Sequence, residues 1–478
     1  MALSKFRQKI PKPSEQAIPR RRYQRSASGL TVGAHLFGFL AIILMLVWLL
    51  HYRGGLDYDS DNSDRVFNVH PFLMFFGFIF FAGEAMMAYK TVLSAHKVQK
   101  YVHAMFHLIA LCSGIFGICA VFKYHDMNNI GDMNSLHSWI GLSTFILYCL
   151  QWVLGFATFL FPRASERTAI RIVPWHMSGG RALLYLSICA ALTGLTQKST
   201  FLGVEHMLSH RELNLINFTG LSILLFGIFV DLSVALARYV VAPSLLLLQT
   251  DNHLHRGLII MAPKSSSYQI SATPVTIFAH LLAIAITTLV LIWLLHFRHG
   301  LALNSSITEK ILNVHTLLMV PIISAAIMAY KTVPGKRNTQ KMVHLILHFL
   351  ALVAIILGIY AAFKFNHESG IPNLLTLHSW LGVITISLFG LQWLFAFFAY
   401  VFPGAESSAR GNLVPWHTFV GMVIFLLAVC TAEAGLLERF LFLSIGRTQE
   451  TLIINFTGLL IFLFAASVSL SVLLPRLY

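Results

Sequence analysis

The sequence predicts an all-α membrane protein with twelve transmembrane helices arranged as two six-helix units. Of its 478 residues, 57% are hydrophobic and only 11% are charged, whereas soluble proteins carry about 25% charged residues. Twelve apolar stretches are long enough to cross a bilayer, which requires about 20 residues of helix. The order of motifs in the first half of the chain also recurs in the second half. These three observations together indicate a duplicated, multi-pass membrane protein.

The twelve apolar stretches are expected to be helices. Lipid offers no hydrogen-bond partners to an open backbone, and the stretches are too long and too evenly apolar for the strands of a barrel. They are expected near residues 33–52, 69–90, 103–123, 136–160, 174–197, 214–240, 273–298, 312–331, 343–363, 376–402, 415–436 and 451–475.

The duplication sets the expected domain boundaries. "LHSWIGLSTFILYCLQWVLGF", which begins at residue 136, is matched by "LHSWLGVITISLFGLQWLFAF", which begins 241 residues later at 377. The first helices match at a spacing of 245, so the second half lacks four residues, about one helical turn, within its second helix. An even number of helices gives both halves the same orientation. We expect a basic tail at 1–30, a first domain at 31–240, a linker at 241–272 and a second domain at 273–478.

Charge indicates the orientation. With the N-terminus placed inside, most of the 34 Lys and Arg residues fall on the inner side, as the positive-inside rule requires. Both termini are therefore expected to be cytoplasmic. The net charge of +15 then reflects topology, with membrane lipid and no nucleic acid as the expected partner. The five cysteines fall in apolar stretches without a CxxC pattern, so no disulfide framework or zinc site is predicted.

Histidines recur at matched depths in both halves. His70 and His137 begin the second and fourth helices at the outer side, and His103 and His176 begin the third and fifth at the inner side. Polar groups in hydrocarbon are costly and usually functional. Topology therefore predicts two outer pairs, His70 with His137 and His315 with His378, and two inner pairs, His103 with His176 and His344 with His417.

Paired imidazoles between facing helices favour haem, whose iron accepts two axial ligands. Zinc is the competing interpretation, but it usually collects three or four ligands, and no acidic residue or cysteine accompanies these pairs. His107 and His348 follow His103 and His344 by four residues on the same helical face. The residues alone leave both members of each such set as candidate ligands.

The motifs around these histidines carry a resemblance. "FNVHP", "KYVHAMFH", "FKYH", "LHSWIG", "QW", "FP" and "PWH" occur in order in the first half, and most of them recur in the second. Together they resemble the cytochrome b561 family of membrane ascorbate-dependent oxidoreductases. The resemblance implies a four-helix haem-binding bundle in each unit and two haem b groups per domain, about four per chain. It implies the same eight axial histidines, with His103 and His344 as ligands in preference to His107 and His348.

The resemblance also implies a function. Electrons would pass from cytoplasmic ascorbate through the haems to monodehydroascorbate or a ferric chelate on the opposite side, with no catalytic residues beyond the haem relay. Ordinary positive-inside clustering explains the inner cations equally well, but charge-assisted hydrogen bonds would suit the ascorbate anion. The expected inner contacts are Lys97, Lys100, Arg167, Arg171, Lys336, Lys341 and Arg410, and the outer contacts are Lys123, His125, Lys364 and His367. The second half departs from the outer motif, because Asn366 aligns with His125.

Two other function classes fit the helix count. Twelve helices in two parallel halves is also the plan of a secondary transporter, and a histidine-lined metal or proton transporter is a further alternative. The expected location is the plasma membrane or an endomembrane such as a vacuole or vesicle. An internal pseudo-dimer of the halves, or a homodimer of the chain, is the expected assembly.

Overall fold

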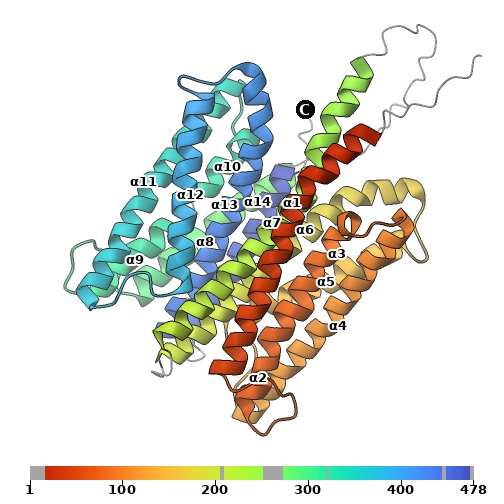
Figure 1. Ribbon diagram of the computed structural model, residues 1–478. Coiled ribbons are helices and arrows are strands. Elements are labelled where there is room, and N and C mark those ends of the chain that lie inside the picture. The colour runs from red at the N-terminus through yellow and green to blue at the C-terminus, as the bar shows by residue number, and fades with distance from the viewer. Residues whose placement is uncertain (1–16, 205–208, 251–272, 320–321, 444–447, 474–478) are drawn as a thin grey trace, which may run out of the picture.

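The computed structural model describes residues 17–204, 209–250, 273–319, 322–443 and 448–473, all of them helical or in short connections. Figure 1 shows the first half at the lower right and much of the second half at the left. The first half contains α1 (Ala17–Val47), η2 (Trp48–Tyr52), α2 (Ser63–Phe72), η3 (Leu73–Phe80), α3 (Phe81–Thr91), α4 (His96–Asn128), α5 (Leu136–Phe159), α6 (Glu166–Val204) and α7 (His210–Thr250). The second contains α8 (Thr273–Ile292), η4 (Trp293–Phe297), α9 (Thr308–Met319), α10 (Ile322–Thr332), α11 (Arg337–Ser369), α12 (Leu377–Tyr400), α13 (Ser407–Phe442) and α14 (Gln449–Leu473).

Within the described residues, eleven helices are long and apolar enough to cross a membrane. They correspond to eleven of the twelve expected stretches. The remaining stretch, 312–331, contains most of α9 and α10, which lie on either side of residues 320–321, outside the described part of the chain. The structure thus bears out an all-helical membrane protein.

Two helices run beyond the expected boundaries. α1 begins at Ala17, inside the expected tail, and α7 continues to Thr250, inside the expected linker. The expected boundaries followed the thickness of a bilayer, but a helix ends where its backbone loses helix-forming residues, and "PSLLLLQT" is rich in leucine, a strong helix former. Residues 1–16 of the tail and 251–272 of the linker lie outside the described residues.

Each half places a four-helix bundle beside a pair of supporting helices. In the first half, α2, η3 and α3 pack on α4, α5 packs on α6, and α1 lies along α7. The second half repeats this plan, with α9 and α10 on α11, α12 on α13, and α8 along α14. α6 packs against α13, so the fifth transmembrane helices of the two halves meet at the centre of the molecule (Figure 1).

A buried polar clamp joins the first and last helices of each half. The indole Nε1 of Trp48 and the Nε of Arg53 both donate to Oε1 of Glu212, at 2.9 and 2.6 Å. Trp293 and Arg298 hold Glu450 in the same way. Buried charges persist in apolar surroundings when they are paired and hydrogen-bonded, so this repeated clamp holds the end of the first helix of each half against the start of the last helix.

The four residues present only in the first half fall in a wider helix. Residues 73–80 form the π-helix η3 between α2 and α3, and π-helical turns are frequently found at functional sites. The second half lacks these residues, yet His315 still occupies the place that corresponds to His70, as described below.

Candidate functional site

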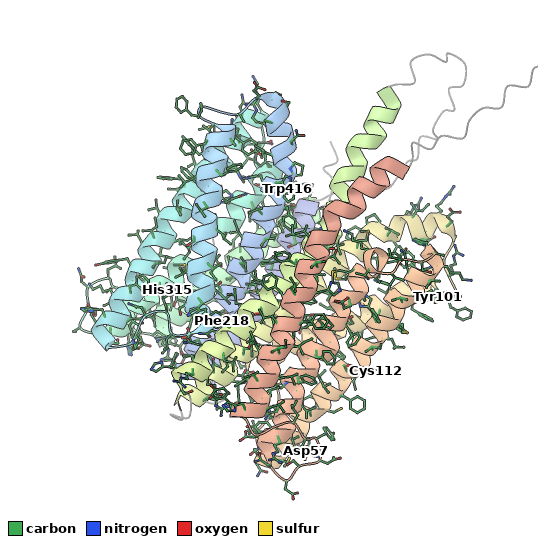
Figure 2. The ribbon with its side chains drawn as sticks, viewed as in Figure 1. Asp57, Tyr101, Cys112, Phe218, His315 and Trp416 are labelled. Carbon is green, nitrogen blue, oxygen red and sulfur yellow. The ribbon has the colours of Figure 1, made fainter. Side chains whose placement is uncertain are left out.

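All four histidine pairs that the sequence predicts come together in the structure. The ring centroids are 6.1 Å apart in His70–His137, His103–His176 and His315–His378, and 6.2 Å apart in His344–His417. We call the His70 and His315 pairs the outer pairs, and the His103 and His344 pairs the inner pairs, after the sides that the sequence predicts. In Figure 2, His315 lies toward the lower end of the second bundle and Trp416, beside His417, toward its upper end.

The spacing within each pair matches two axial ligands of one metal. An imidazole nitrogen binds a metal at about 2 Å, and two such bonds in line, with the distance from each nitrogen to its ring centre, place the centroids about 6 Å apart. The four pairs reproduce this spacing in both halves, including the second-half outer pair beside the four-residue deletion. No group of three or more His, Cys, Asp or Glu side chains is arranged to bind a metal within the described residues. The geometry fits haem iron.

Hydrogen bonds orient six of these rings through Nδ1. His70 lies 2.9 Å from the carbonyl of Gly117, His103 lies 2.8 Å from that of Ala85, and His137 lies 3.0 Å from that of Ala190. A donor at Nδ1 leaves Nε2 as the metal ligand, which is the usual arrangement of metal-binding histidine. The second half repeats the bonds with the carbonyls of Gly358, Ala326 and Thr431 beside His315, His344 and His378.

A glutamine performs this role for the other two inner histidines. The side-chain amide of Gln151 lies 3.1 Å from Nδ1 of His176, and that of Gln392 lies 2.9 Å from Nδ1 of His417. The same amide nitrogens donate to the backbone carbonyls of His176 and His417, at 2.7 and 3.0 Å, so each glutamine holds the backbone of its histidine and lies against the ring. These are the glutamines of the repeated "LQW" motif.

Space for a large flat group surrounds the first outer pair. A cavity of about 590 Å³ is lined by His70 and His137 together with Met74, Phe75 and Phe145, within the usual range of cofactor sites, about 300–1,000 Å³. Glycines allow helices to approach the ligand rings closely: a Cβ on Gly194 would lie 2.8 Å from Cε1 of His137. The equivalent Gly435 would place a Cβ 2.6 Å from Cε1 of His378.

The histidine pairs lie in two segments of the chain that match a known protein family. The model of the eukaryotic cytochrome b561 family matches residues 69–202 and again residues 314–443. The chain belongs to the cytochrome b561 family. Each matched segment contains one complete set of two histidine pairs, so the family domain occurs twice in tandem.

Shorter proteins with named functions are similar to the chain. A probable ascorbate-specific transmembrane electron transporter 1 from Oryza sativa subsp. japonica is 47% identical over 43% of this chain and 92% of its own length. Transmembrane ascorbate ferrireductase 1 of Arabidopsis thaliana is 42% identical over 44% of this chain and 87% of its own. The plasma membrane ascorbate-dependent reductase CYBRD1 of Xenopus laevis is 40% identical over 42% and 73%.

The additional histidines of the inner level differ between the two b561 domains. His107 lies 4.5 Å from His103 by ring centroids, and its Nδ1 is 2.5 Å from the hydroxyl of Tyr148. In the second domain, Phe389 replaces this tyrosine and lies 5.5 Å from His348 by ring centroids. Nδ1 of His348 is buried and has no hydrogen-bond partner among the described residues. The two domains therefore differ here by one hydroxyl group: His107 has a hydrogen-bond partner and His348 packs against a phenyl ring.

The outer contacts expected from the sequence also differ between the domains. Lys123 Nζ donates to the carbonyl of Tyr58 at 2.7 Å, and His125, which lines the cavity, lies 2.7 Å from Asp132. In the second domain, Lys364 Nζ donates to the carbonyl of Leu303 at 2.8 Å. Asn366 and Asn373 replace His125 and Asp132 in the second domain, and Asn366 Nδ2 donates to Oδ1 of Asn373 at 2.9 Å. Asn366 thus occupies the place of His125, whereas His367 points to an exposed position on the next helical step.

The expected inner cations lie at or just before the beginnings of four helices. Lys100 and Lys341 are half-buried and precede His103 and His344 by three residues on the same helices. Lys341 Nζ donates to the carbonyl of Tyr400 at 2.6 Å. The other expected cations are exposed: Lys97 near the start of α4, Arg167 and Arg171 at the start of α6, Lys336 before α11, and Arg410 at the start of α13.

The buried acids of the first domain have structural partners. Asp231 on α7 accepts from Arg181 Nη2 at 2.9 Å and from the hydroxyl of Tyr185 at 2.8 Å, both on α6. Glu84 lies 3.1 Å from Nε2 of His35 on α1. These contacts join α7 to α6 and α3 to α1.

Sequence reasoning missed several residues that shape the ligand sites. Gln151 and Gln392 were visible in the repeated "QW" motif, and the repeated "TG" and "AG" before residues 195 and 436 mark the glycines beside the outer rings. Tyr148 gave no signal, because a tyrosine in an aromatic membrane helix has no distinguishing pattern. Its hydrogen bond to His107 depends on the relative rotation of two helices.

Proposed function

We propose that this protein is a tandem cytochrome b561 that moves electrons across a membrane from cytoplasmic ascorbate to monodehydroascorbate or a ferric chelate. The observation that carries the proposal is the repeated stack of an inner and an outer histidine pair within each domain, each at the spacing of two axial ligands. The ascorbate and ferric specificities are supported by the names of relatives that match 43% and 44% of the chain over most of their own length.

Eight histidines would hold the haem groups, with two haem b per domain and about four per chain. When bound, haem supplies the one-electron redox chemistry, and the protein supplies position and environment. Carbonyls and glutamine amides would fix the imidazole orientations, and aromatic and aliphatic side chains form much of the outer cavity. The axial ligands would be His70, His137, His103, His176, His315, His378, His344 and His417.

Substrate contacts would lie at the two ends of each stack. On the inner side, Lys100 and Lys341 are nearest in sequence to the inner pairs, and the exposed cations Lys97, Arg167, Arg171, Lys336 and Arg410 would attract the ascorbate anion. On the outer side, Lys123 and His125 would contact the acceptor in the first domain. Lys364 is its equivalent in the second, where Asn366 and the exposed His367 replace the single histidine.

The full topology forms part of the proposal. α9 and α10 together would provide the twelfth transmembrane helix, both termini would face the cytoplasm, and the domains would extend over 31–240 and 273–478. The clustering of cations at the inner helix beginnings supports this orientation. The plasma membrane or an endomembrane such as the vacuole is the proposed location, with the two domains paired inside one chain.

The direct test is a reduced-minus-oxidised spectrum of the purified chain, with haem quantified per polypeptide. We expect about four haems per chain with low-spin bis-histidine signals. In vesicles that contain the protein and internal ascorbate, external ferricyanide or a ferric chelate should be reduced, and empty vesicles provide the control. A purified protein without haem would refute the proposal and favour a transporter.

The glutamines beside the inner histidines give a second prediction. Gln151→Glu places a carboxylate against Nδ1–H of His176, which makes the imidazole more basic and favours the oxidised metal. The midpoint potential of one inner haem should fall by about 60 mV, equivalent to a ten-fold change in a one-electron equilibrium constant. Gln392→Glu is the matched variant in the second domain. Redox titration followed by optical spectra measures both, and an unchanged potential would exclude this role.

A further inference from the structure

A short motif that the electron path does not use recurs on the last helix of each domain. "INFTG" occupies residues 216–220 on α7 and 454–458 on α14. Asn217 and Asn455, in the middle of this motif, are almost fully buried, with exposed fractions of 0% and 2%. A buried amide needs a hydrogen-bond partner, and the partners are found across the boundary between the domains.

Each asparagine donates to the opposite domain at the same position. Asn455 Nδ2 donates to the carbonyl of Asn134 at 3.2 Å, and Asn217 Nδ2 donates to the carbonyl of Leu375 at 3.1 Å. Both acceptors lie in the short connection that leads into α5 or α12. These helices carry His137 and His378, each as its second residue.

The glycine of each motif packs against the first residue of α5 or α12 in the opposite domain. A Cβ on Gly458 would lie 2.3 Å from Cδ1 of Leu136, and a Cβ on Gly220 would lie 2.8 Å from Cδ2 of Leu377. Leu136 and Leu377 are 0% and 1% exposed. They immediately precede the outer ligands, so the last helix of one domain packs directly against the start of the ligand helix in the other.

Aromatic packing adds to this contact on one side. The rings of Phe218 on α7 and Trp380 on α12 lie 5.3 Å apart by centroids in an edge-to-face arrangement, a geometry that stabilises aromatic pairs. Figure 2 shows Phe218 where the two bundles meet. Trp380 is two residues after His378, so this contact also bears on the first turn of the ligand helix.

The second domain also contributes to the wall of the first domain's outer cavity. Phe440 and Leu441 at the end of α13, and Thr451 near the start of α14, line the same cavity as His70 and His137. The cavity of the first outer pair is therefore closed by residues from both domains.

The backbone before each ligand helix adopts a conformation that needs support from its surroundings. Met133 and Leu374 adopt the left-handed conformation, with φ of 56° in both, which costs free energy for residues other than glycine. Such a conformation persists when surrounding contacts hold it. The indoles of Trp139 and Trp380 donate to these two carbonyls at 2.8 Å, and the asparagine of the opposite domain binds the next carbonyl along the chain.

From these contacts we propose that each domain positions the outer haem ligand of the other domain through its last helix. Asn455 and Gly458 position His137, and Asn217 and Gly220 position His378, so retention of haem at each outer site depends on the opposite half of the chain. These are positioning residues that act through residues 134–136 and 375–377. The inference rests on the proposed haem sites and adds that the two domains are coupled at the outer level.

The test is a crossed pair of backgrounds, each with a single outer haem. His378→Ala leaves the first-domain outer site, and His137→Ala leaves the second-domain one. Asn455→Ala and Asn217→Ala are then introduced into each background. Transfer of haem to excess apomyoglobin measures the rate of haem loss, and the low-spin electron paramagnetic resonance signal identifies the remaining outer haem. The inner haems report whether each variant is folded.

We expect a crossed pattern. In the His378→Ala background, Asn455→Ala should accelerate loss of the outer haem about ten-fold, a typical effect of removing the support of a metal ligand, whereas Asn217→Ala should not. In the His137→Ala background the two variants should exchange roles. Gly458→Ala and Gly220→Ala provide a second pair, because their added methyl groups press on Leu136 and Leu377.

The outcomes separate this inference from the proposed function. Equal effects of both asparagine variants in each background would indicate general destabilisation and overturn the inference, as would an effect confined to the asparagine's own domain. Either result leaves haem on the protein and the proposed electron transfer intact. A chain that binds no haem would overturn both the function and the inference.

Discussion

Replacement of His103 and His344 together by alanine is expected to reduce ascorbate-driven electron transfer at least about 100-fold, because loss of a ligand exceeds the 10–100-fold effects of its supporting residues. Each histidine belongs to an inner pair with 6.1 or 6.2 Å between ring centroids, and each Nδ1 bonds a backbone carbonyl. Without them, electrons from ascorbate would meet no inner haem in either domain. Haem content should fall from about four to about two per chain, and ascorbate-loaded vesicles should no longer reduce an external acceptor.

His107 and His348 provide the matched control, because they lie one turn away on the same helices. His107 binds the hydroxyl of Tyr148 through Nδ1, so it is arranged as a neighbour of the inner pair. The His107→Ala/His348→Ala variant should retain all its haem, with altered potentials at the inner level. If this variant loses the inner haems and His103→Ala/His344→Ala keeps them, the assignment of the axial ligands is wrong.

Replacement of Asp231 by alanine is expected to lower the free energy of unfolding by about 3 kcal/mol or more. Asp231 is 1% exposed and accepts from Arg181 and Tyr185 across the interface of α6 and α7. Its removal would leave the guanidinium of Arg181 without its carboxylate in apolar surroundings, and breaking one side of a buried pair is strongly destabilising. Thermal unfolding of the purified protein in detergent, followed by loss of the haem absorbance, measures the change.

The second domain supplies the control for this prediction. Met422, Leu426 and Ser469 occupy the positions of Arg181, Tyr185 and Asp231. The triple variant Arg181→Met/Tyr185→Leu/Asp231→Ser should therefore be nearly as stable as the parent chain, because no charge is left unpaired. A triple variant as unstable as Asp231→Ala would show that the ion pair itself stabilises the fold.

Much of the candidate site could be predicted because the bilayer restricts the chain so strongly. The basic residues indicate the direction of each helix, and a histidine at the beginning of such a helix must lie near one membrane face. This depth sufficed to pair His70 with His137 and His103 with His176. The structure brings the members of each pair together. Their role as haem ligands remains a prediction of the proposed function.

Other contacts depend on how each helix is rotated about its own axis. The sequence gives little information on this rotation when a helix is apolar on all sides. The bond between His107 and Tyr148, the pairing of Asp231 with Arg181, and the contact of Asn455 with the opposite domain all belong to this class. The continuation of α7 to Thr250 also has no counterpart in the sequence pattern, since bilayer thickness limits how long a span must be and sets no upper limit on the helix.

The difference between the two domains beside His107 and His348 has an evolutionary consequence. Two identical subunits encoded by a single reading frame must accept every substitution in duplicate. Here Tyr148 and Phe389 occupy equivalent places, one hydrogen-bonded to a histidine and the other apolar. Because the two domains are encoded separately within one chain, a substitution can change one domain and leave the other unchanged. Selection can therefore adjust the two domains independently.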